Sequence, residues 1–128
     1  MAEAPSDLNR LIQIAADTVV AAQRRLPKEL RALARDVPVH YESLPADDLI
    51  ADGFEEDILG LFTGAPHGSE LSHDNVIPAQ ILLYLENLWD FAEGDLDVFR
   101  DEVRLTYLHE LGHYFGWDED DLAARGLD

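Results

Sequence analysis

The stretch between Asp95 and Gly116 constrains the fold most strongly, because it carries the start, the periodicity and the end of one long helix. Asp95 or Asp97 can cap the first turn, and Gly116 suits the left-handed residue that often ends a helix. Between them, apolar residues recur at helical spacing: Val98, Phe99, Val103, Leu105, Tyr107, Leu108, Leu111 and Phe115. The chain must therefore fold around a long amphipathic helix.

This helix contains the run His109-Glu110-Leu111-Gly112-His113, an H-E-x-x-H motif. Residues four apart lie about 40° apart around an α-helix and one turn along it, so the two imidazoles point the same way. We predict that His109 and His113 bind one zinc ion. Glu110 is rotated by about 100° from His109, where it is better placed to act on a metal-bound water than on the metal. We expect it to be the general base of peptide-bond hydrolysis by a zinc-activated water.

The same angles divide the helix into two faces. Glu102, Thr106 and the two histidines fall within a stripe of about 60°, which we expect to be polar and to face a cleft. The expected core side carries Tyr107, Leu111, Tyr114 and Phe115. A rival interpretation is a plain acidic domain whose helix exposes two histidines and binds no specific metal.

Composition excludes several classes of function. The chain has no cysteine, so a metal site must use His, Asp or Glu. Its 27 acidic and 9 basic residues give a net charge of −18, which disfavours nucleic-acid partners and anionic membranes. No apolar run approaches the roughly 20 residues needed to span a bilayer, and no signal peptide is recognisable at the N-terminus. We therefore expect a cytoplasmic protein.

The remaining sequence predicts a single α+β domain over residues 1–128. Helical spacing indicates helices at 8–22, at 28–35 with Pro27 at the first position, and at 118–124. Strands are predicted at 37–41, 58–63 and 80–86, although residues 82–89 also fit a helix. We expect loops at 44–57 and 64–78.

The motif and its surroundings resemble the minimal zincin-like metallopeptidases, a family of small bacterial proteins. That family's signature is H-E-x-G-H-H-F-G-x, then an acidic run and a leucine; residues 109–122 read HELGHYFGWDEDDL. Further likenesses lie at residues 26–30 with 37–39, at 59–62, and at 81–84, which resembles the family's edge strand. One departure is Tyr114, where the family often has a second histidine. Because Tyr114 lies on the expected core side, we expect the change to be harmless.

The resemblance implies a reduced zincin fold, in which a small mixed sheet packs on an N-terminal helix and on the H-E-x-x-H helix. It also implies zinc as the metal and a peptide or protein as the substrate. If residues 81–85 form an edge strand, their backbone could pair with an extended substrate as an added strand.

A catalytic zinc ion usually has three protein ligands, and the motif supplies two. Compact zincins turn at a glycine and take the third ligand from the tenth residue after the first histidine, which here is Glu119. We favour Glu119, with Asp118 as the alternative and Asp120 as a further one-residue shift. The competing explanation is that these acidic residues simply cap the last helix. His67 and His73 are weaker candidates, and we expect His40 on the protein surface.

The sequence therefore predicts a zinc metallopeptidase of the H-E-x-x-H type. The alternative is a non-catalytic, metal-binding zincin-like protein that acts as a protein-interaction module.

Overall fold

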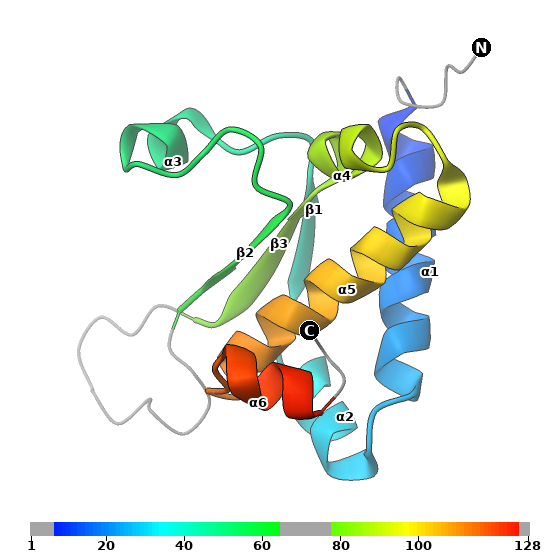
Figure 1. Cartoon of the computed structure of the whole chain (residues 1–128), viewed down its shortest axis with the longest axis vertical. Helices are drawn as coiled ribbons and strands as arrows, with labels where there is room; N and C mark the ends of the chain where they lie inside the picture. Colours follow the sequence, from blue (N-terminus) through cyan, green and yellow to red (C-terminus); the bar gives the residue numbers. More distant parts are fainter. Residues whose placement is uncertain (1–6, 65–77, 126–128) are drawn as a thin grey trace.

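The computed structural model of the protein describes residues 7–64 and 78–125. Helix α5 (Leu96–Tyr114) crosses the molecule diagonally and packs against helices α1 and α4 and strands β2 and β3 (Figure 1). As predicted, Asp95 caps it: one carboxylate oxygen accepts hydrogen bonds from the backbone amides of Asp97 (2.9 Å) and Val98 (3.1 Å). Because α5 contacts both the helices and the sheet, its packing fixes where the H-E-x-x-H motif lies in the molecule.

Helix α5 ends in a Schellman motif. Gly116 has a φ of +81°, its amide bonds to the carbonyl oxygen of His113 (3.0 Å), and the Trp117 amide bonds to that of Gly112 (3.0 Å). The predicted glycine stop is therefore confirmed. It ends the helix three residues after His113, and the acidic run then leads into α6 (Glu119–Ala124).

Three strands form a mixed sheet in the order β1-β3-β2. Strand β1 (Val39–Glu42) runs parallel to β3 (Gln80–Tyr84), and β2 (Gly60–Thr63) runs antiparallel to it. The predicted α+β class, a small mixed sheet packed on the H-E-x-x-H helix, is confirmed.

The expectation that residues 81–84 form an edge strand is wrong. Strand β3 lies in the centre of the sheet, with Ile81 opposite Val39 on one side and Phe62 on the other. Because both sides already have partner strands, the backbone of residues 81–84 offers no free edge to a substrate. Strand β3 is also the most buried strand, and this explains its nearly continuous apolar sequence.

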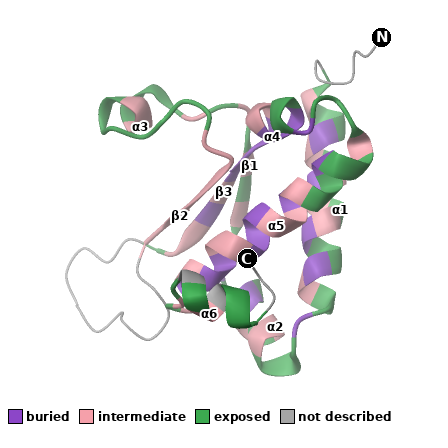
Figure 2. Cartoon of the chain, viewed as in Figure 1, coloured by how far each residue is buried: buried purple, intermediate pink, exposed green. Residues whose placement is uncertain are grey.

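The first helix covers the other flank of α5, and the second packs on the first. Helix α1 (Leu8–Arg24) buries a stripe of residues at helical spacing: Leu11, Ala15, Val19 and Ala22. Helix α2 (Lys28–Arg35) follows at the predicted residues, but Pro27 is its N-cap and not its first residue. Figure 2 shows the buried positions of α1, α5 and β3 gathered where these elements meet. Tyr107, Phe99 and Leu11 are among the largest fully buried side chains of this core.

Two short helices were not predicted. The expected loop at 44–57 contains α3 (Asp47–Ala51), and strand β3 passes directly into α4 (Leu85–Phe91), with Tyr84 as the N-cap. The sequence of residues 82–89 fits both structures because the chain adopts both in succession. Helix α6 (Glu119–Ala124) follows α5. Within residues 7–64 and 78–125, no helix is both long and apolar enough to cross a membrane.

Candidate metal centre

The two histidines and the glutamate of the motif form one cluster on α5. Each offers a ligand atom, and the ligand atoms of His109, Glu110 and His113 all lie within 4.8 Å of one another. All three side chains are half-buried. The cluster is therefore open to a ligand, yet partly screened from solvent.

The imidazoles have the geometry that a shared metal ion requires. Their Nε2 atoms face each other at 3.2 Å, and the ring planes are nearly perpendicular at 84°. Two nitrogens bound to one tetrahedral zinc ion at about 2.0–2.1 Å would lie about 3.3–3.4 Å apart. Such a distance also suits a hydrogen bond between one protonated and one bare ring nitrogen. In either case the two Nε2 atoms face each other at a separation close to that of two nitrogens on one zinc ion, so the donor set fits zinc.

Packing on the far side of α5 holds this orientation. Tyr114 is buried, with 6% of its surface exposed, and its ring lies 6.1 Å from that of Phe62 on β2. Leu111 and Tyr107 are buried in the main core. Tyr114 therefore lies on the core side, as predicted, and its replacement of the family's second histidine leaves the metal-facing side of the helix intact.

A groove of about 360 Å³ adjoins the cluster. Helix α5 forms one wall with His109, Glu110, Thr106 and Leu105, and residues 58–60 at the start of β2 form the other. The volume is within the range of small ligand pockets. A bound group in this groove would contact His109 and Glu110 together.

Gly60 sets the distance between the two walls. A Cβ atom built there would lie 2.6 Å from the Thr106 Cγ2 atom and 3.2 Å from the carbonyl oxygen of Leu82, so only glycine fits without movement. Thr106 is 9% exposed because β2 covers it. Thr106 nevertheless lines the groove with His109, as the predicted cleft-facing stripe requires, whereas the sequence reasoning missed Gly60. The lone glycine in a predicted strand was the available signal for such a close approach.

The acidic run after Gly116 is only partly described. Asp118 and Asp121 form a reciprocal cap at the start of α6: the Asp118 carboxylate accepts from the Asp121 amide (2.8 Å), and the Asp121 carboxylate accepts from the Asp118 amide (3.1 Å). Asp118 and Asp120 are exposed, and neither joins the His109–Glu110–His113 cluster. The backbone of Glu119 begins α6, whereas its side chain lies outside the described part of the structure.

Among the described residues, no other histidine joins this cluster. His40 is exposed on β1, as expected. His67 and His73 lie outside the described residues.

The comparison with known families agrees with this geometry. Residues 34–127 match the family described as zincin-like metallopeptidase, and the chain belongs to that family. The match begins in α2 and includes the sheet, the His109–Glu110–His113 cluster and the acidic run. No curated protein matches the chain significantly. The fold, the site and the family together define a zincin-like protein whose His-Glu-His group can hold a metal ion.

Proposed function

We propose that the protein is a zinc-dependent peptidase that uses the His109–Glu110–His113 cluster. The observation that carries the proposal is the convergence of the two Nε2 atoms, 3.2 Å apart, beside a glutamate that lines the same groove. A zinc ion held there would polarise a peptide carbonyl and make water a nucleophile near neutral pH.

The chain's own residues would perform the other steps. The Glu110 carboxylate takes a proton from the attacking water and donates it to the departing amine, because one carboxylate within reach of both atoms can serve in turn as base and acid. His109 and His113 hold the metal on a helix whose ends are fixed by Asp95 and Gly116. Glu119, which begins α6, is our choice for the third ligand.

Strand β2 offers the substrate a place to bind. Among the described residues it pairs only with β3, so the other edge of Gly60–Thr63 can accept an extended peptide as an added strand. Its first residue also lines the groove that holds His109 and Glu110. A peptide along this edge would pass the catalytic cluster, a role that the sequence had suggested for residues 81–85.

The alternative function is metal binding without catalysis, in a module that recognises another protein. The exposed side chain of Leu44 (50%) favours it, because with Pro45 and Ile50 it lines a groove of about 720 Å³, and contiguous exposed apolar surface often marks a contact site. Only the peptidase requires Glu110 to act as a general base.

The test combines metal content with activity. We expect about one zinc per chain after dialysis, lost in a His109→Ala/His113→Ala variant and kept in His40→Ala, the matched control on β1. Against a library of quenched fluorescent peptides, Glu110→Gln should keep the zinc and lower the rate by about 10²–10⁴-fold, the usual contribution of a general base.

Each result separates the alternatives. If both the native protein and Glu110→Gln bind zinc and show equal rates of peptide cleavage, the protein is the non-catalytic module. Equal, weak metal uptake by the native protein and the double histidine variant would mean an acidic domain without a specific metal site.

A further inference from the structure

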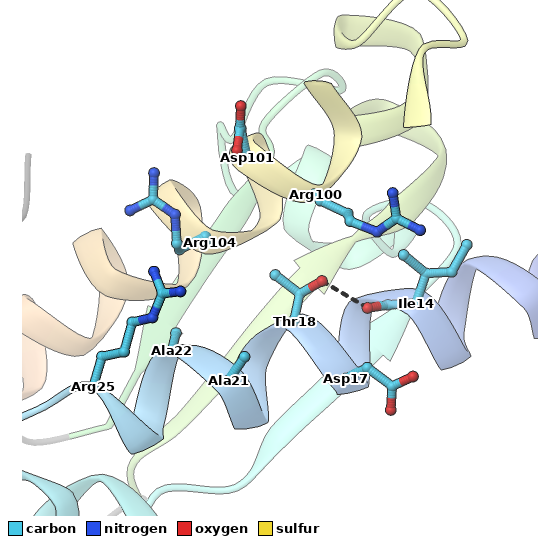
Figure 3. A pocket seen from close by; sticks show the side chains of 9 residues that line it. All are labelled: Ile14, Asp17, Thr18, Ala21, Ala22, Arg25, Arg100, Asp101 and Arg104. Carbon is cyan, nitrogen blue, oxygen red and sulfur yellow. Dashed lines mark hydrogen bonds between the residues drawn. The ribbon is translucent and has the colours of Figure 1, made fainter. Parts of the chain in front are cut away.

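A second pocket lies between α1 and α5, on the other side of the helix that carries the motif. It has a volume of about 350 Å³, and three arginines line it: Arg25, Arg100 and Arg104 (Figure 3). The whole chain has only 9 basic residues against 27 acidic ones, so a third of its cations gather at one pocket. Such a concentration in so acidic a chain is unexpected for a surface that serves only solubility.

Two of these arginines have no acidic partner within the described residues. Arg100 pairs with Asp97 at 3.2 Å, whereas no carboxylate described by the structure lies within 4.0 Å of Arg25 or Arg104. Figure 3 shows both side chains at the same end of the pocket, Arg25 from the end of α1 and Arg104 from α5. Like charges that line one pocket repel each other, and an anion bound beside them would offset that repulsion.

The floor of the pocket is apolar and narrow. Ala21 and Ala22 lie below the two guanidinium groups, and Ile14 closes the other end. The hydroxyl of Thr18, also in the lining, already donates a hydrogen bond to the carbonyl oxygen of Ile14 (2.8 Å). The pocket therefore offers charge at one end and a surface for a small aliphatic group beside it.

The balance of charge selects the kind of anion. Asp17 and Asp101 also line the pocket and Arg100 is paired with Asp97, so the lining as a whole is close to neutral. A carboxylate, which carries one negative charge, therefore suits the pocket better than a phosphate group, which carries nearly two at neutral pH. The planar fork of a guanidinium also matches the two oxygens of a carboxylate.

We infer that this pocket binds a peptide carboxylate that is attached to an aliphatic group, with Arg25 and Arg104 as its ligands. The carboxylate comes either from a peptide C-terminus or from an acidic side chain, and the chemistry of recognition is the same. Residues 100 and 104 precede His109 by nine and five positions, which puts them roughly 140–180° from it around α5. Binding here is therefore separate from the metal site and does not depend on the proposed peptidase activity.

Binding of short peptides tests the inference. The probes are acetyl-Ala-Ala-Leu with a free C-terminus, its amide, and acetyl-Ala-Glu-Leu amide, titrated into the full chain at constant ionic strength and followed by backbone amide NMR shifts. The Glu110→Gln background keeps every peptide intact. We expect a peptide with a carboxylate to shift amides of α1 and α5 that border the pocket, and Arg25→Gln/Arg104→Gln to weaken binding about tenfold or more.

The control is Arg10→Gln/Arg35→Gln, which removes the same charge from exposed positions outside the pocket. It should bind as the parent does. Comparing the first and third peptides shows whether a terminal or a side-chain carboxylate is taken. The inference fails if the amide binds as well as the acids, if inorganic phosphate binds more tightly than they do, or if both arginine variants lose affinity equally. Thermal unfolding of each variant ensures that a loss of binding is not a loss of fold.

Discussion

At the level of single residues, the helix imposes the geometry of the His109–Glu110–His113 cluster. The four-residue spacing of His109 and His113 brings their Nε2 atoms to 3.2 Å, and Glu110 follows at the side of the same groove. These relations are local, since they need only a helix at residues 109–113. For this reason the sequence alone was enough to predict them.

The third ligand is a residue-scale prediction that local geometry does not determine. We expect Glu119→Gln to lower zinc affinity by more than the roughly 10–100-fold that loss of an outer partner costs, because it removes a direct ligand. Asp118→Asn is the matched control. Asparagine also caps helices well, so the start of α6 should survive and zinc affinity should change little. Competition with a chromophoric chelator measures both affinities.

If Asp118→Asn lowers zinc affinity more than Glu119→Gln does, the third ligand is Asp118. If neither substitution lowers zinc affinity, neither residue is a ligand. The sequence left this choice open because it depends on how the chain continues after the Schellman turn at Gly116. Part of the acidic run has a structural task, as the reciprocal cap between Asp118 and Asp121 shows. Carboxylates that cap a helix and carboxylates that bind a metal look the same in a sequence.

At the level of elements, the contact between β2 and α5 forms the groove, and Gly60 is its closest point. We expect Gly60→Ala to destabilise the fold by about 1–3 kcal/mol, the usual cost of overpacking, because its Cβ would lie 2.6 Å from the Thr106 methyl carbon. Thr106→Ser removes that methyl. Gly60→Ala should therefore cost much less in a Thr106→Ser background, as measured by denaturant unfolding of all four proteins.

An equal cost in both backgrounds would show that the methyl is not what excludes alanine, and the carbonyl oxygen of Leu82 would then be the obstacle. The same contact marks a limit of sequence reasoning. Helix periodicity placed Thr106 on a stripe that faces a cleft, but it did not show that Gly60, 46 positions earlier, forms the opposite wall and covers it. Periodicity describes the faces of one element and not which neighbour lies on them.

The same distinction explains which elements were predicted. Helices α1, α2 and α5 carry caps or sustained apolar spacing, and the sequence placed each close to its observed bounds. Strand β3 was found, but its central position was not, because strand order results from long-range pairing. The arginine pocket could not be predicted either, since Arg25 and Arg104 come to line one pocket only when α1 packs against α5.

At the level of the whole molecule, buried tyrosine hydroxyls link stability to alkaline pH. Burial, followed by the charge of Tyr107, raises the pKa of Tyr41 from 10.0 to about 12. Burial, followed by the charges of Glu42 and Asp48, also raises the pKa of Tyr84, whose hydroxyl has no hydrogen-bond partner among the described residues. Both tyrosines lie on the sheet, Tyr84 buried and Tyr41 half-buried, so their ionisation would add poorly solvated negative charge to an already acidic protein.

We expect the free energy of unfolding to fall as the pH rises from about 10 to about 12. In this range the unfolded chain, with ordinary tyrosine pKa values, has released protons that the native state still holds, so rising pH favours the unfolded chain. Tyr41→Phe should reduce the fall because phenylalanine cannot ionise. Urea unfolding of both proteins at pH 7 and pH 11, with a chelator present, separates the two effects of the substitution: the difference at pH 7 reports lost packing, and the additional difference at pH 11 reports ionisation. If both proteins lose the same stability between the two pH values, the hydroxyl of Tyr41 does not limit alkaline stability, and the other tyrosines with raised pKa values, Tyr84 and Tyr107, must account for the loss.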